Sequence, residues 1–184
     1  MPWNIEDQGG LPGVAQNGLN TKKSVDFSTK LGIKSLTSTE LTTVYTTAKF
    51  TVGTRGRDAS GNEYIFLAGV ASVAAGTWVS FDELYVTTLL TTTSVGSAAV
   101  ALAANVASTW GWFQIYGKAS GKIGNAVADN AQLFISSVTG SVDDLVVTGD
   151  IIYGAISRGA SSVTGANIDV QLNYPFTTQT AGSY

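Results

Sequence analysis

The feature that most constrains the fold is an alternation of apolar and polar residues near the C-terminal end of the chain. In the stretch NIDVQLNYPF, residues 167–176, every second side chain is apolar. A period of two is typical of a β-strand that buries one face, and Pro175 indicates that the strand ends near a sheet edge. We expect the buried face to consist of Ile168, Val170, Leu172, Tyr174 and Phe176.

From residue 25 onward, the chain divides into short β-type runs separated by turns rich in Gly, Ser and Asn. Residues 46–54 and 62–70 flank RGRDASGN, which predicts a hairpin because Asp, Gly and Asn tolerate the positive φ angles of tight loops. Residues 94–108 fit helical and strand spacing alike, and we predict strand because the segment has no charged face. No long helix is indicated. The predicted fold is therefore all-β, a jelly-roll-like antiparallel β-sandwich or barrel.

Residues 1–24 do not follow this pattern, because their apolar residues are isolated and show no period of 2 or 3.6. Such a segment cannot bury a face by itself. We therefore divide the chain into an extended N-terminal arm, residues 1–24, and a β-sandwich domain, residues 25–184. Two interpretations of the arm stay open: a disordered terminus, or a segment that docks on a neighbouring subunit. In the second case the contact residues are Trp3, Ile5, Leu11, Val14 and Leu19.

Charged residues are sparse, at 12% of the chain, and the net charge is −3. This argues against nucleic acid as a partner, because phosphate binding needs clustered Lys and Arg. We expect the two small basic clusters, residues 22–23 and 55–57, to lie in solvated loops. The N-terminus has no signal-peptide pattern, and residues 94–108 are too few to span a bilayer. We therefore expect a protein made in the cytoplasm that is soluble and has no membrane partner.

The chain contains no His and no Cys, which removes the usual general base, the usual thiolate nucleophile and common zinc ligands. Two carboxylate pairs exist, Asp82/Glu83 and Asp143/Asp144, but adjacent residues of a strand point to opposite faces. The stretch SVDDLVVTGD, residues 141–150, lacks the spacing of an EF-hand calcium loop, and we predict a turn. We expect no enzyme activity, no catalytic residue, no cofactor and no bound metal.

Residues 108–127, STWGWFQIYGKASGKIGNAV, hold four aromatic side chains within seven positions. On strand alternation, Trp110, Trp112 and Tyr116 share one face, while Phe113 and Ile115 share the other. A strand that is apolar on both faces lies either inside a two-sided core or against another chain. Three explanations stay open: core packing, a subunit interface and stacking on a sugar.

Four stretches, in this order, resemble a group of tailed-bacteriophage capsid decoration (cement) proteins. The resemblance covers roughly residues 48–176, and residues 1–47 do not share it. It assigns structural roles only: Gly111, Trp112, Phe113, Gln114, Tyr116 and Gly117 to a central strand, and Asp129 with Ala131 to the turn after it. The stretches are VGTRGRDASGNEYIFLAGVASVAAGTWVSFDE, WGWFQIYGKASGKIGNAVADNAQLFIS, VVTGDIIYGAISRG and VQLNYPF.

The resemblance implies a structural virion protein that sits on the outer surface of an icosahedral head, bridges subunits of the major capsid protein and stabilises the shell. It further implies self-association, as a homotrimer or, alternatively, a homodimer. The interface residues would then come from the arm and from Trp110, Trp112 and Tyr116. The alternative function is a carbohydrate-binding β-sandwich of a phage fibre or head projection, in which the same three aromatic side chains stack on a sugar.

Overall fold

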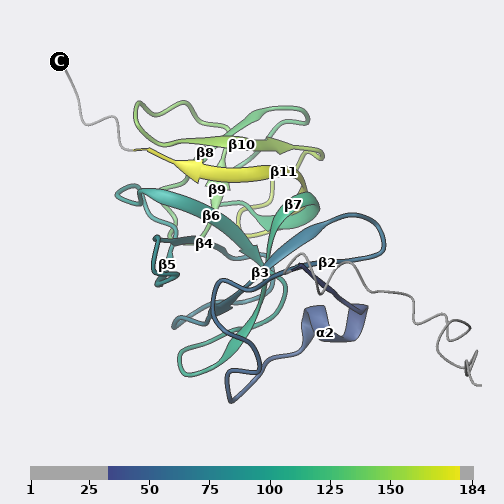
Figure 1. The fold of residues 1–184 in the computed structure, drawn as a ribbon. Helices are drawn as coiled ribbons and strands as arrows, with labels where there is room; N and C mark the ends of the chain where they lie inside the picture. The colour runs from purple at the N-terminus through teal and green to yellow at the C-terminus, as the bar shows by residue number, and fades with distance from the viewer. Residues whose placement is uncertain (1–32, 179–184) are drawn as a thin grey trace, which may run out of the picture.

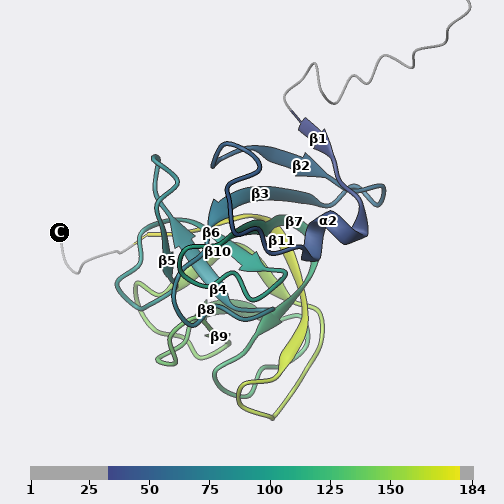
Figure 2. The same cartoon turned by 90° about the horizontal axis from the view of Figure 1, so that it is seen from below.

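The computed structural model describes residues 33–178, so the predicted N-terminal arm lies outside the described residues. The structure is almost entirely β, with 45% strand and 3% helix, and the all-β prediction is confirmed. The strands form a mixed sheet that is not closed and that folds over as a β-sandwich (Figures 1 and 2). The strands are β1 (Ile33–Ser35), β2 (Arg55–Arg57), β3 (Glu63–Ala68), β4 (Trp78–Phe81), β5 (Thr87–Leu89), β6 (Gly96–Ala101), β7 (Trp110–Lys122), β8 (Gln132–Ile135), β9 (Val142–Asp143), β10 (Ile151–Ser157) and β11 (Asn167–Thr177).

The strand order is β1-β2-β3-β7-β6-β11-β10-β8-β9, and β4 pairs with both β6 and β5. Among these named strands, only β1 and β2 pair in parallel. The thirteen-residue strand β7 pairs with β3 along its first half and with β11 along its second half. The two halves of β7 therefore belong to different parts of the sandwich.

Three clusters of buried side chains fill the molecule. The largest collects residues from β4, β6, β8, β10 and β11, with Trp78, Leu133 and Leu172 among those that are fully buried. A second cluster includes Phe113 and lies on one face of the first half of β7. A third includes Trp112 and lies on the opposite face of the same strand half. The first half of β7 is thus buried on both faces by its own chain.

The predicted hairpin forms, but its first strand is β2 and not residues 46–54. The Asp58 carboxylate explains the position of the turn, because its Oδ1 accepts hydrogen bonds from the backbone N–H groups of Ser60 and Asn62, both at 2.9 Å. The prediction that residues 55–57 form a loop is wrong: both arginines are exposed, but they lie on a strand. The strand predicted within residues 94–108 is confirmed as β6, which covers residues 96–101.

A five-residue helix, α2 (Ser38–Thr42), follows β1 and was not expected. Thr37 and Glu40 begin it with a capping box, in which the Thr37 side chain accepts from the Glu40 backbone N–H and the Glu40 side chain accepts from the Thr37 backbone N–H. The segment after α2 carries Tyr45 and Phe50 onto the third cluster. In Figure 2, α2 lies beside the strands at the β1 end of the sheet.

Candidate functional site

The aromatic residues of β7 divide between the core and the surface. The Trp112 ring is fully buried, and its centroid lies 5.3 Å from that of Phe66 and 5.4 Å from that of Phe50. Trp110 is half-buried at the edge of the same cluster. Tyr116, by contrast, is 37% exposed. The prediction that Trp110, Trp112 and Tyr116 share one face is therefore wrong.

A β-bulge explains the change of face. Glu63 pairs with Tyr116 and Tyr64 pairs with Gln114, so Ile115 has no partner on β3. The extra residue reverses the alternation, as bulges do, and Tyr116 turns outward. Gly117 follows with a φ of +95°, a conformation that strongly favours glycine. From this point on, β7 exposes one face and buries the other.

Four exposed aromatic side chains gather where β7, β11 and β10 lie side by side, and we call this group the aromatic strip. The Tyr116 and Tyr174 ring centroids are 5.3 Å apart. The Tyr153 and Phe176 rings are stacked, with centroids 5.0 Å apart and planes 16° from parallel. Each ring is between 37% and 44% exposed. The members of the strip are Tyr116, Tyr153, Tyr174 and Phe176.

Backbone irregularities of β10 and β11 bring the last three of these rings to the surface. Tyr174 has a φ of +49°, and the register between the two strands shifts at Gly154. Ile168, Val170 and Leu172 are buried as predicted, but Tyr174 and Phe176 point outward. The prediction that they share the buried face is wrong, because the irregularity at Tyr174 reverses the alternation of the strand.

The strip ends at a charged group on β2 and β3. The Tyr174 hydroxyl donates to Glu63 Oε2 at 2.7 Å, and Arg57 forms an ion pair with the other oxygen of that carboxylate. Burial raises the pKa of Glu63, but hydrogen bonds from Arg57 and Tyr174 outweigh this effect and lower it below its ordinary value. The Arg55 guanidinium lies 5.9 Å from the centroid of the Tyr174 ring. These contacts hold the Tyr174 ring in place at one end of the strip.

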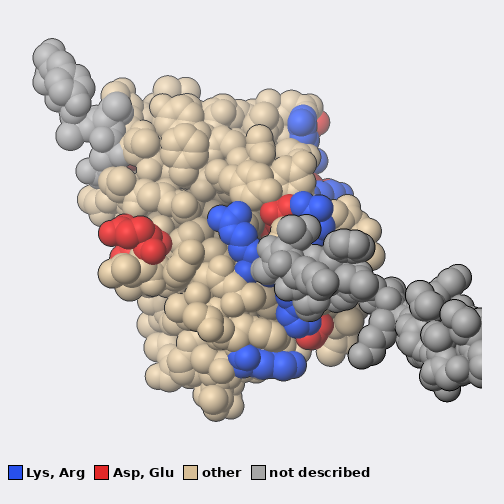
Figure 3. Space-filling model, in the orientation of Figure 1, with Lys and Arg blue, Asp and Glu red and all other residues tan. Residues whose placement is uncertain are grey.

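The rest of the strip lies in uncharged surroundings. Strand β10 has no charged residue, and β11 has only Asp169, which forms an ion pair with Lys118 of β7. In Figure 3 much of the surface around β10 and β11 carries neither Lys and Arg nor Asp and Glu, while Lys and Arg gather below and to the right. The strip is thus an apolar surface with one polar end.

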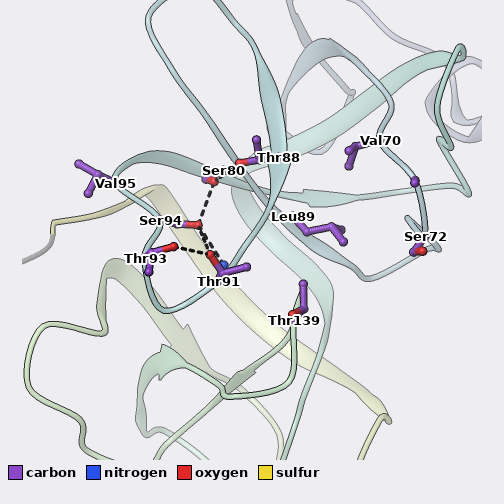
Figure 4. Close-up of a pocket in the computed structure, with 11 residues that line it drawn as sticks. Val70, Ser72, Ser80, Thr88, Leu89, Thr91, Thr93, Ser94, Val95 and Thr139 are labelled. Atoms are coloured by element: carbon purple, nitrogen blue, oxygen red, sulfur yellow. Dashed lines mark hydrogen bonds between the residues drawn. The ribbon is translucent and has the colours of Figure 1, made fainter.

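A second surface feature is a shallow bowl beside the β4–β5 hairpin, with a volume of about 670 Å³ (Figure 4). The hydroxyls of Ser80 and Thr88 lie 2.9 Å apart, and Ser94 Oγ accepts from the Thr91 backbone N–H at 2.9 Å. No charged side chain lines the bowl, and its lining combines hydroxyl groups with the apolar side chains of Val70, Leu89 and Val95. The hydroxyl-bearing residues around it are Ser72, Ser80, Thr88, Thr91, Thr93, Ser94 and Thr139.

Three of the four carboxylates noted in the sequence, Asp82, Asp143 and Asp144, accept hydrogen bonds. Asp82 Oδ1 accepts from the backbone N–H groups of Leu84 and Val86 and so closes the β4–β5 hairpin. The buried Asp143 accepts from the Asn125 side chain at 2.9 Å and from the Leu145 backbone N–H. It lies on the short strand β9, so the turn predicted for residues 141–150 is correct only for the residues after this strand. Asp82 thus stabilises a local turn, while Asp143 and Asp144 connect their segment to residues 125–128.

The structure brings only one predicted site residue, Tyr116, into the aromatic strip. Trp112 is buried, and Trp110 lies at the edge of the third cluster. The strip residues Tyr153, Tyr174 and Phe176 were not predicted as site residues. Pro175 was the available signal, since proline interrupts the strand ladder beside two aromatic residues. Five predicted interface residues lie outside the described part of the chain: Trp3, Ile5, Leu11, Val14 and Leu19.

Within residues 33–178, no three side chains of the types His, Cys, Asp and Glu gather in a group that could hold a metal ion. No helix in this range is long and apolar enough to cross a membrane. Comparison of the chain with family models, with curated proteins and with solved structures finds no match.

Proposed function

We propose that this protein is a structural virion protein that decorates a bacteriophage capsid, bridging major capsid protein subunits on the outer surface of the head. The sequence resemblance over residues 48–176 supports the proposal. The observation that carries it is the aromatic strip: four exposed rings on a β-sheet, with charged side chains gathered at its Tyr174 end. Aromatic side chains are enriched in the cores of protein–protein interfaces, and charged side chains are depleted there.

The strip alone is a small contact. A capsid offers many copies of the same binding surface, however, and a decorating protein that touches several of them gains affinity by multivalency. A rigid sheet suits this role, because a preorganised surface loses little conformational entropy on binding. Adhesion of this kind needs no catalytic group.

The test measures co-sedimentation of the purified protein with heads of the encoding phage from which decoration has been stripped. The double variant Tyr153→Ser, Phe176→Ser should bind roughly tenfold more weakly or worse, because each lost aromatic contact is worth about 1 kcal/mol or more. The matched control is Val146→Ser, Val163→Ser, which removes two exposed apolar side chains from loops outside the strip. Equal binding by both double variants would contradict a role of the strip, and no binding by the wild type would contradict the function.

The second candidate function is carbohydrate binding, and the hydroxyl-lined bowl favours it. Its uncharged lining offers hydroxyl groups that can hydrogen-bond to a sugar, whereas the stacked Tyr153 and Phe176 rings each cover one face of the other. A glycan array decides between the two functions. Retention of a glycan that Thr88→Val, Thr91→Val abolishes would favour this candidate, whereas capsid binding without retention on the array would favour decoration.

A further inference from the structure

Arg55 of β2 carries a charge at the Tyr174 end of the strip that no carboxylate neutralises. Arg57 occupies one oxygen of Glu63 and the Tyr174 hydroxyl the other, and no Asp or Glu within residues 33–178 lies within ion-pair distance of Arg55. Arg55 is exposed, and its guanidinium lies 5.9 Å from the centroid of the Tyr174 ring. Two arginines and one glutamate therefore leave a net charge of +1 beside the exposed rings.

A small notch beside Arg55 has the size and the lining of a carboxylate site. Its volume is about 30 Å³, and a water molecule needs roughly 10–15 Å³ of such space, so the notch accepts about two water-sized atoms. Phe81 and Ile115, which line it, are buried, whereas Arg55 and Ser97 are exposed and add a guanidinium and a hydroxyl. Tyr174 also lines the notch, which therefore adjoins the strip.

A partner that covers the strip also covers this charge. Because Arg55 lies over the Tyr174 ring, a surface that packs on the ring removes water from the guanidinium as well. A buried charge without a partner opposes association, and a carboxylate removes this penalty by accepting two parallel hydrogen bonds from the guanidinium. The partner of the strip should therefore be acidic at the Tyr174 end and apolar beyond it.

The exposed rings offer too little area for a second copy of the chain in dilute solution. They are 37–44% exposed, and a fully buried aromatic side chain covers roughly 150–250 Å², so roughly 300 Å² of ring surface remains open. A stable interface between two proteins buries about 800 Å² on each partner. A small contact of this kind suits a lattice that presents many equal binding surfaces, because multivalency then supplies the affinity.

We propose that the notch binds the carboxylate of an Asp or Glu side chain on the surface of the major capsid protein, while an apolar side chain beside it packs on Tyr153 and Phe176. The identity of the partner rests on the proposed function, whereas the carboxylate site does not. Arg55 is the specificity-determining residue of this site, because it disfavours apolar surfaces that lack an acidic group.

Co-sedimentation with stripped heads tests the site in the full chain. Arg55→Glu should bind at least tenfold more weakly than the wild type, because it places a carboxylate against the carboxylate of the partner. The matched control is Lys49→Glu, which makes the same change of charge and also removes a cation from an aromatic ring, that of Tyr45 at 5.4 Å. It should bind within twofold of the wild type. Equal weakening by both variants, or by neither, would overturn the proposal.

A titration without heads separates the failure of the site from the failure of the function. The probes are two peptides, acetyl-Phe-Glu-Glu-amide and acetyl-Phe-Gln-Gln-amide, and NMR follows the Arg55 Nε–H and the Tyr174 ring. We expect the glutamate peptide to bind at least fivefold more tightly, and Arg55→Gln to abolish the difference. Equal binding of the two peptides, or a dimer of the free protein that Arg55→Glu dissociates, would overturn the carboxylate site.

The two measurements together assign each failure. Selective binding of the glutamate peptide by a protein that does not decorate heads would leave the carboxylate site standing and contradict the function. Decoration of heads that Arg55→Glu leaves unchanged would do the reverse.

Discussion

Two groups of aromatic side chains, only four residues apart on β7, have opposite environments. The buried group centres on Trp112, which packs against Phe50 and Phe66. The exposed group begins at Tyr116 and continues through Tyr174. The residue types are alike, so hydrophobicity does not separate the groups. The bulge at Ile115 does, because it lies between the two groups and reverses the alternation of the strand.

The different environments of the two groups predict which substitutions change folding stability and which change binding. Residues of the buried group touch side chains on β3 and on the segment after α2, so removing one leaves a cavity inside the molecule. Residues of the strip lie on top of a sheet whose other face is already packed on the largest cluster. We therefore expect substitutions in the buried group to change the free energy of unfolding strongly, and substitutions in the strip to act mainly on partners.

The largest effect is expected for Trp112→Ala. The ring is fully buried, and truncation of such a side chain lowers the free energy of unfolding by about 3–5 kcal/mol. Urea denaturation followed by circular dichroism measures the change. Trp112→Phe is the control, because it keeps an aromatic ring and should cost clearly less. A loss below about 1 kcal/mol for the alanine variant would contradict the core position of Trp112.

The next effect is expected for Gly117→Ala, at the point where β7 changes its environment. A Cβ here would lie 1.9 Å from Asn62 Oδ1, and the φ of +95° is strained for alanine. We expect a loss of about 1–3 kcal/mol in the free energy of unfolding. Gly165→Ala is the matched control, since Gly165 has a φ of +79° but open space around it. Equal losses would show that backbone strain acts alone, without the clash.

The sequence predicts the β class because it depends on alternation, and the run from Ile168 to Leu172 follows that rule. It does not predict the reversal at Tyr174, because a bulge depends on register with β10, which is distant in the sequence. The same holds for Tyr116, whose direction is decided by the register of β3 against β7. The aromatic strip could therefore not be predicted from the sequence, because long-range strand pairing assembles it from three strands.

A smaller effect is expected for Tyr174→Phe, which removes the hydroxyl that donates to Glu63. At pH 7 the loss should be about 1 kcal/mol, because a partly exposed hydrogen bond to a charged group contributes modestly. Tyr153→Phe is the control and should be neutral, since its hydroxyl has no hydrogen-bond partner within residues 33–178. Equal losses in the two variants would contradict a stabilising role of the Tyr174–Glu63 hydrogen bond.

The Tyr174→Phe effect should also depend on pH. The pKa of Glu63 is lowered in the folded protein, so its stabilising contribution is complete above the unfolded pKa, about 4.3, and is lost as the pH falls through the folded value. The difference in unfolding free energy between wild type and Tyr174→Phe should therefore shrink between pH 5 and about pH 2. A difference that stays constant over this range would show that Glu63 is not the acceptor that matters.

The smallest effect is a coupling energy between two ring pairs, measured by double-mutant cycles to alanine. The exposed pair Tyr153–Phe176 should couple by roughly 0.2–1 kcal/mol, as cross-strand aromatic pairs do. The buried pair Phe66–Trp112 should couple more strongly, by about 0.5–1.5 kcal/mol, because both rings are excluded from water. Equal coupling in the two cycles would mean that stacking geometry, and not burial, decides the strength of these contacts. It would also mean that the strip contributes to folding stability as the core does. This result would weaken the proposal that the strip is a binding surface.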